Sequence, residues 1–255
     1  MSYIITDSKH YTNIANAIRE KLQVDTEYYP EDMATAIASI PATSDGTDSP
    51  VGGIWFLNPD DNGNVTKIKY VNYNISSLSL EGLPTDKSYL KEVVFEQSSV
   101  TTIPVNCFQG CSNLSKINIP ETVTTIAGSG TFQYCTSLMT LHLPHGLKTI
   151  GQWAFWGCSA LNTINIPNTL NNIGADIFTL CSNLENVALE NEFNCANLNL
   201  SVSTKYSKET IVSWINALAD RSDTAAYRLT IGATNLAKLD EEDIAIATAK
   251  NWTLA

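Results

Sequence analysis

The chain has 255 residues, 44% of them hydrophobic, which is enough apolar material for a sizeable buried core. Its formal net charge is −11, and no cluster of Lys or Arg offsets it, so the composition argues against non-specific binding to nucleic acid or anionic lipid. The longest apolar runs are far too short to span a bilayer, which predicts a soluble protein without membrane insertion.

The N-terminal part predicts a small helical module on a linker. Residues 1–40 read as two amphipathic helices, with Asp7 or Ser8 as a cap of the first and Pro30 at the first position of the second. Residues 41–53 are rich in Pro, Gly, Ser, Thr and Asp and predict a flexible linker. The opening "MSYIITDSKHYTNIANAIREK" has no basic region followed by an apolar core, so we expect no signal peptide in this sequence.

Residues 54–193 repeat one pattern with a period of about 23 residues. Its best copies are "TTIPVNCFQGCSNLSKINIPETV" (101–123), "TTIAGSGTFQYCTSLMTLHLPHGL" (124–147), "KTIGQWAFWGCSALNTINIPNTL" (148–170) and "NNIGADIFTLCSNLENVALENEF" (171–193). They share xxI-x-x-x-x-F-x-x-C-x-x-L-x-x-I-x-I-P-x-x-V/L, with one extra residue in the second copy. Two weaker copies, "VTKIKY" and "LKEVVF", precede them. We therefore expect an α/β repeat solenoid whose units each supply a short strand and an irregular or 3-10 return.

Cysteines occupy one column of this template, at Cys111, Cys135, Cys158 and Cys181. Cysteine is small, often fully buried, and a weak S–H donor, so we expect these residues to fill the core. A disulfide between Cys107 and Cys111 and a zinc site are the alternatives. Parallel side-chain directions oppose disulfides between stacked cysteines, and no CxxC motif or suitably spaced histidine supports zinc.

Residues 194–255 change period and predict helix-rich repeats that cap the solenoid. "SKETIVSWINALAD" (207–220) predicts a helix capped by Ser207, and "DEEDIAIATAK" predicts a second helix with acidic residues in its first turn. "AYRLTIG" and "NWTLA" predict short strands. End repeats are expected to present a polar outer face.

The repeat template resembles the BspA-type leucine-rich repeat, I-G-x-x-A-F-x-x-C-x-x-L-x-x-I-x-L-P, and the match is best in "IGQWAFWGCSALNTINIP". The stretches "LTIGATNLAKL" and "IATAKNWTLA" resemble the ends of other BspA-like proteins. Such repeats occur in bacterial and protozoan surface proteins that bind host proteins or cells. The resemblance therefore implies binding rather than catalysis.

The N-terminal stretches "NIANAIREKL" and "YYPEDMATAIASI" resemble a segment of tail and baseplate-associated proteins from phages of Gram-positive bacteria. This second resemblance implies that residues 1–40 attach the chain to a virion or a similar assembly, or mediate self-assembly.

Strand alternation predicts one candidate binding face. In L-x-x-I-x-I the apolar residues point inward and the intervening residues point outward. The outward positions of the central copies are Lys116, Asn118, Thr140, His142, Thr163 and Asn165. This mild, polar face suits hydrogen bonding to a glycan or a protein, and a solvated face without a ligand is the alternative.

The return segment predicts a second candidate surface. Tyr134, Trp153 and Trp156 flank the core positions Phe132 and Phe155. If they are exposed, they form an aromatic patch that can stack on a sugar or anchor a partner; the alternative is that they pack against neighbouring repeats.

No G-x-S-x-G, H-E-x-x-H, P-loop or dinucleotide motif occurs, so we predict no catalytic residues, no metal site and no cofactor. The function expected is non-catalytic recognition by a phage or prophage tail-associated protein with an outward-facing repeat domain. A cell-surface or secreted adhesin that binds a host protein or glycan is the alternative, and a carbohydrate-active enzyme is the remaining one.

Overall fold

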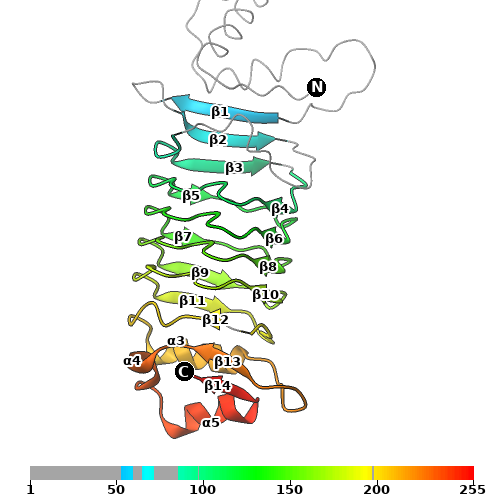
Figure 1. Ribbon diagram of the computed structural model, residues 1–255, viewed down its shortest axis with the longest axis vertical. Coiled ribbons are helices and arrows are strands. Elements are labelled where there is room, and N and C mark those ends of the chain that lie inside the picture. Colours follow the sequence, from blue (N-terminus) through cyan, green and yellow to red (C-terminus); the bar gives the residue numbers. More distant parts are fainter. Residues whose placement is uncertain (1–52, 60–64, 72–85, 97, 197) are drawn as a thin grey trace, which may run out of the picture.

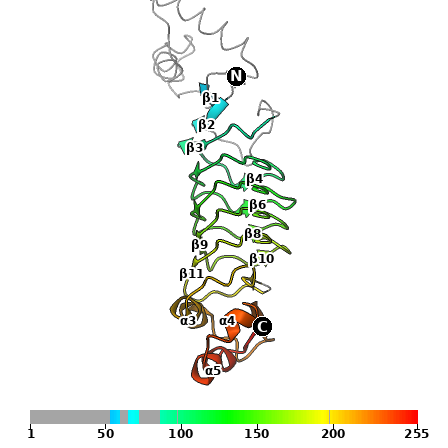
Figure 2. The ribbon, with the colours of Figure 1, turned by 90° about the vertical axis from the view of Figure 1, so that its left-hand side faces the viewer.

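The computed structural model describes residues 53–59, 65–71, 86–96, 98–196 and 198–255. The hairpin predicted for residues 1–40 lies outside these ranges, as does the predicted linker up to residue 52. The described chain winds into a stack of flat coils around one continuous apolar core (Figures 1 and 2). The predicted repeat fold with short parallel strands is confirmed. None of the helices in the described ranges is long and apolar enough to cross a membrane.

One strand of each coil comes from the L-x-x-I-x-I run. The first sheet contains β1 (Gly53–Pro59), β2 (Val65–Val71), β3 (Glu92–Glu96) and β5 (Lys116–Ile117). The second contains β7 (Thr140–Leu141), β9 (Thr163–Ile166) and β11 (Asn186–Leu189). All neighbours are parallel except β1 and β2, which are antiparallel. The break between the sheets lies between β5 and β7, and β7 belongs to the copy that carries the extra residue.

The strand register confirms the weak copies. Ile68 of β2 pairs with Val93 of β3, and Val93 pairs with Ile117 of β5. Ile68 and Val93 are buried, as the inward positions of the pattern require. The degenerate copies therefore extend the same core toward the N-terminal end of the stack.

Each coil has a second strand that the sequence pattern does not predict. The pairs at the start of the repeats form β4 (Thr102–Ile103), β6 (Thr125–Ile126), β8 (Thr149–Ile150) and β10 (Asn172–Ile173). They make a four-stranded parallel sheet with the isoleucines in register. A strand of two residues is too short to show alternation of apolar and polar side chains, so its sequence cannot be distinguished from that of a loop.

The return segments form a third ladder of backbone hydrogen bonds between coils. The N–H of Phe108 donates to the carbonyl of Thr131 at 2.8 Å, and the N–H of Phe132 donates to the carbonyl of Ala154 at 2.7 Å. The N–H of Phe155 continues the series to the next coil. Successive coils are thus joined on three sides, which leaves few buried backbone groups unpaired.

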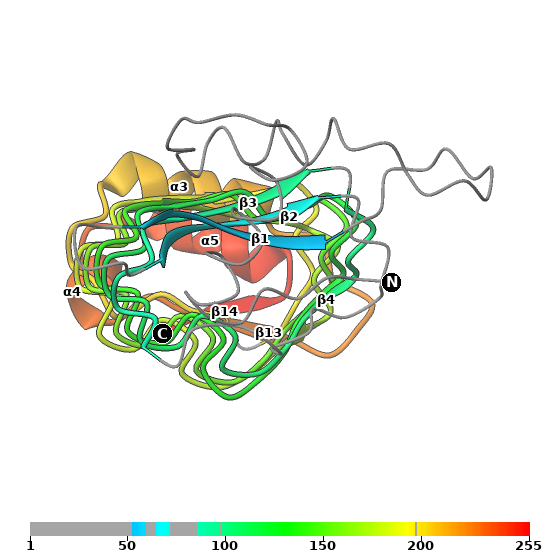
Figure 3. The same ribbon diagram turned by 90° about the horizontal axis from the view of Figure 1, so that it is seen from above.

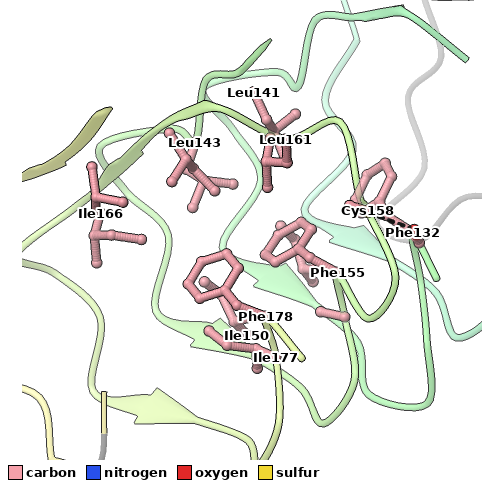
Figure 4. Packing of buried hydrophobic residues seen from close by; sticks show 14 of the residues in the cluster. Phe132, Leu141, Leu143, Ile150, Phe155, Cys158, Leu161, Ile166, Ile177 and Phe178 are labelled. Atoms are coloured by element: carbon pink, nitrogen blue, oxygen red, sulfur yellow. Dashed lines mark hydrogen bonds between the residues drawn. The ribbon is translucent and has the colours of Figure 1, made fainter. Parts of the chain in front are cut away.

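The predicted phenylalanine column is a stack of rings in the core. Phe108 and Phe132 have ring centroids 5.3 Å apart, and Phe132 and Phe155 are 5.7 Å apart. Phe178 follows at 5.6 Å from Phe155, and Figure 4 displays this stack among the surrounding leucines and isoleucines. Offset ring pairs stabilise each other by about 0.5–1.5 kcal/mol beyond the burial of their area.

The cysteine column is buried, as predicted, and the thiols of Cys135, Cys158 and Cys181 each donate to a main-chain carbonyl. The Sγ atom of Cys135 donates to the main-chain carbonyl of Phe108 at 3.2 Å. The Sγ atom of Cys158 donates in the same way to the carbonyl of Phe132 at 3.1 Å (Figure 4). All six cysteines of the chain are free, so the alternative disulfide between Cys107 and Cys111 does not form. Burial raises the pKa of the Cys111 thiol to about 12.

Glycines directly after β8 and β10 let these coils approach their neighbours closely. A Cβ added to Gly151 would lie 2.1 Å from the backbone of Gly128, and one added to Gly174 would lie 2.2 Å from the backbone N of Gln152. Neither glycine has a positive φ, so space rather than conformation excludes larger residues here.

In the C-terminal part, helices and a small sheet follow the last coil of the stack. Its elements are β12 (Leu198–Asn199), α3 (Lys208–Ala217), β13 (Tyr227–Thr230), α4 (Ala233–Leu236), α5 (Glu241–Ala249) and β14 (Trp252–Leu254). The order β12-β13-β14 forms a parallel sheet. The short helix α4 was not predicted, because its single turn has no side-chain N-cap bond and no apolar stripe.

Polar contacts join helix α3 to the stack and to helix α5. The indole N–H of Trp214 in α3 donates to the carbonyl of Val187 in β11 at 2.6 Å. Lys208 at the start of α3 forms an ion pair with Asp240, 2.6 Å away, and with Asp243, 2.8 Å away, at the start of α5. The predicted Ser207 cap of α3 is confirmed.

The outermost helix is less polar than an end repeat is expected to be. Helix α5 exposes Ile244 and Ile246, and only Ala247 of this helix is buried. Isoleucine and alanine alternate along its length, so whichever face turns outward carries apolar side chains.

Candidate functional site

The predicted binding face on the strands is placed where alternation puts it. Lys116, Thr140 and His142 are exposed, and Thr163 is half-buried. The six predicted residues are shared between the two strand sheets, because β5 and β7 are not paired.

Two members of that face hold the coils together. The Leu143 N–H donates to Asn165 Oδ1 at 2.7 Å, and Asn165 Nδ2 donates to the Leu143 carbonyl at 2.8 Å. Asn118 forms the same pair of bonds with Phe95, at 2.9 and 3.0 Å. Each amide adds a rung beyond the last residue pair that its strand makes with the preceding coil, Val93–Ile117 for Asn118 and Leu141–Ile164 for Asn165. The side-chain amides of Asn118 and Asn165 are thus occupied by hydrogen bonds within the fold. Ligand binding by this face stays a prediction.

His142 occupies the same column but makes different contacts. Its Nε2 lies 4.0 Å from Glu121 Oε1, and its ring lies edge-on to that of His145. His145 Nδ1 contacts Glu190 Oε1 from two coils further on. Among the described residues, no three His, Cys, Asp or Glu side chains are grouped as a metal site would need.

The aromatic residues of the return segments lie on another side of the molecule. In the view along the axis of the stack, the segments that follow β4, β6, β8 and β10 lie on the opposite side of the coil from β2 and β3 (Figure 3). Tyr134 and Trp153 are 48% and 37% exposed, whereas Trp156 is half-buried. Leu180, which was not predicted, is 58% exposed. We call Tyr134, Trp153, Trp156 and Leu180 the apolar ridge.

Contacts between coils shape this ridge. Trp153 and Trp156 meet edge to face, with ring centroids 6.1 Å apart. The ring of Tyr134 covers Gly157 of the next coil so closely that an added Cβ would lie 2.6 Å from it. The indole N–H of Trp156 is buried and has no acceptor among the described residues.

Three residues of the ridge have a left-handed backbone. Their φ values are +61° for Tyr134, +58° for Trp153 and +65° for Leu180. This conformation costs a bulky L-residue roughly 1–2 kcal/mol and is ordinary for glycine and tolerable for Asn or Asp.

The equivalent positions of the other copies follow this preference. The Trp153 column contains Asn106, Gly130 and Asp176, and the Tyr134 and Leu180 column contains Gly110 and Gly157. The same column comparison would have identified Leu180 from the sequence, because it stands where two other copies have glycine.

Residues 101–218 match the model of the BspA type leucine rich repeat region, in six copies. This match covers less than half of the chain and shows what that part is similar to. The resemblance noted in the sequence is thereby confirmed for this part of the chain. No curated protein matches the sequence.

Three solved structures are similar to this chain, and all are leucine-rich-repeat proteins. One from Bacteroides ovatus ATCC 8483 is 34% identical over 45% of this chain and 30% of its own, with a TM-score of 0.38. A leucine rich cell surface protein from Faecalibacterium prausnitzii A2-165 is 18% identical over 56% of this chain and 55% of its own, with a TM-score of 0.35. The T. pallidum leucine-rich-repeat protein is 18% identical over 78% of this chain and 95% of its own, with a TM-score of 0.41. The matched part thus spans less than two thirds of the first two proteins.

Proposed function

We propose that this protein is a non-catalytic recognition protein whose leucine-rich repeats bind a ligand through the apolar ridge. The observation that carries the proposal is the combination of exposure and backbone conformation at Tyr134, Trp153 and Leu180. Stability alone favours Gly, Asn or Asp at these positions, as the other copies have. Bulky apolar side chains that weaken the fold and face solvent are best explained by a partner that contacts them.

The column residues supply the substitutions that test this proposal. Trp153→Asn and Tyr134→Gly introduce residues that the same backbone position has in other copies, so we expect both variants to fold. Ile246→Gln on α5 is the matched control, because Ile246 is 38% exposed and lies on the C-terminal helix, away from the return segments.

Binding of the full chain to immobilised extracellular-matrix proteins and polysaccharides can be followed by biolayer interferometry. We expect the two ridge variants, but not the control, to lose binding. Retention of every interaction by the double ridge variant would contradict the proposal.

The setting of this recognition is a second part of the proposal. The resemblance of residues 1–40 to phage tail-associated proteins supports attachment to a virion or a similar assembly, with the solenoid facing outward. The repeat type supports a cell-surface or secreted adhesin as the alternative. Static light scattering on the full chain and on a version that starts at Val51 separates them. A full-length oligomer whose truncation is a monomer favours the virion setting, and two monomers favour the adhesin.

A further inference from the structure

The surroundings of the apolar ridge are almost free of charge. The return segments 105–110, 129–134, 152–157 and 175–180 contain no Lys or Arg, and Asp176 is their one carboxylate. The chain as a whole carries 26 acidic and 15 basic residues, so this neutrality is a local property. A polyanionic ligand would need basic side chains here, and a cationic ligand would need more than one carboxylate.

The polar groups beside the ridge are neutral hydrogen-bonding groups. Gln152 is exposed next to Trp153, and Thr179 is half-buried in the column of Trp156. Gln133, in the same column, accepts a hydrogen bond from Gln109 Nε2 at 2.5 Å. Amide and hydroxyl groups therefore border the aromatic rings on adjacent coils.

The ridge is also small for a protein interface. A stable protein–protein contact covers about 800 Å² on each partner. Four side chains, one of them half-buried, offer a narrow surface with two exposed aromatic rings. A pyranose chain matches such a surface, because its rings have apolar C–H faces for stacking and a rim of hydroxyls for neutral amides.

Resting on the binding function proposed above, we propose that the apolar ridge recognises a neutral polysaccharide. Tyr134 and Trp153 stack on sugar rings, and Gln152 and Gln133 bind the hydroxyl groups at their edges. The ladder of the return segments holds both aromatic residues through backbone bonds, from Tyr134 N to Trp156 O at 2.8 Å and from Trp153 N to Ala175 O at 3.1 Å. A backbone fixed in this way lowers the entropy lost on binding.

The test uses the full chain and four soluble probes: a mixed-linkage β-glucan, a mannan, a dextran and, as the charged comparison, heparin. Tryptophan fluorescence and isothermal titration calorimetry measure binding, and fibronectin serves as the protein probe. We expect at least one neutral polysaccharide to bind and Trp153→Asn to weaken it by roughly tenfold or more, which is the size of a central hot-spot residue. The control Ile246→Gln should bind like the unchanged chain.

The outcomes separate this inference from the proposed function. Ridge-dependent binding of fibronectin without any neutral polysaccharide overturns the glycan assignment and leaves the ridge as a binding site. Binding of heparin alone overturns it as well. Polysaccharide binding that survives Trp153→Asn together with Tyr134→Gly overturns both, provided that circular dichroism shows the variants to be folded.

Discussion

Replacing Asn165 by aspartate tests whether this residue serves the fold or a ligand. The amide accepts a bond of 2.7 Å from the Leu143 N–H and donates one of 2.8 Å to the Leu143 carbonyl. Asn165→Asp keeps the size and the accepting oxygen but places a carboxylate oxygen against the carbonyl. One bond, worth about 0.5–1.5 kcal/mol, is lost, and the unpaired carbonyl adds about 1–3 kcal/mol. We expect the free energy of unfolding to fall by about 2–4 kcal/mol at pH 7.

The pH dependence of this loss is a second signature. A carboxyl beside a carbonyl oxygen is favoured in its neutral form, so its pKa in the folded variant rises above the value of about 3.9 in the unfolded chain. A raised folded pKa means that stability is gained as the pH falls through it. The neutral acid can also donate to the Leu143 carbonyl, so the deficit of Asn165→Asp should shrink between pH 7 and about pH 4.

Thermal and urea denaturation, followed by circular dichroism, measure both effects. A chain of this size loses about 2–4 °C of melting temperature per kcal/mol. Asn186→Asp is the matched control, because Asn186 is exposed and its Nδ2 bonds only a side chain, Asn162 Oδ1. Equal stability of the Asn165→Asp variant and the unchanged chain at pH 7, or a deficit that does not change with pH, would refute this reasoning.

Three further predictions concern other parts of the stack. Gly151→Ala should destabilise the protein by about 3 kcal/mol or more, because its Cβ meets the backbone of the preceding coil; Gly146→Ala, with 3.6 Å of space, should change the melting temperature little. Leu180→Gly should raise the free energy of unfolding by up to about 1 kcal/mol, because the strain of the left-handed backbone at leucine exceeds the entropic cost of glycine. A free energy of unfolding, measured by urea denaturation, that is lower than that of the unchanged chain would refute this prediction. The bond from Lys208 lowers the pKa of Asp240 to about 2. Asp240→Asn, which keeps the helix cap, should lower the melting temperature near neutral pH. This difference from the unchanged chain should vanish as the pH falls from about 4 to about 2. A difference in melting temperature that does not change with pH would contradict the ion-pair account.

Much of this fold could be predicted because each coil repeats the same requirements. The buried phenylalanine and cysteine columns stand out by recurrence, and Ser207 marks a helix start through its own chemistry. The strands β4, β6, β8 and β10 were missed because two residues carry no periodic signal. The antiparallel pairing of β1 with β2 was missed as well, because β2 was interpreted as a copy of the repeat, whose neighbours are parallel, and β1 precedes the first copy.

The candidate site was predicted in part, for a related reason. Tyr134 and Trp153 were identified as large side chains beside the core, but their left-handed backbone becomes visible only in the structure. Asn118 and Asn165 look like any outward polar residue of a strand. Their bonds to the preceding coil depend on where the strand hydrogen bonds stop, which a sequence pattern does not record.

A solenoid separates the requirements of the fold from those of binding more clearly than other architectures do. Because its coils share one backbone, each column shows which residues that backbone conformation prefers. Asn165 satisfies a main-chain need, and Gly151 satisfies a spatial one, so neither requires a ligand to explain it. Trp153 and Leu180 are bulky residues at left-handed positions where other copies have Gly, Asn or Asp, so both weaken the fold, and both are exposed. Such departures are therefore stronger grounds for a binding role than exposure or polarity alone, which is why the apolar ridge ranks above the strand face.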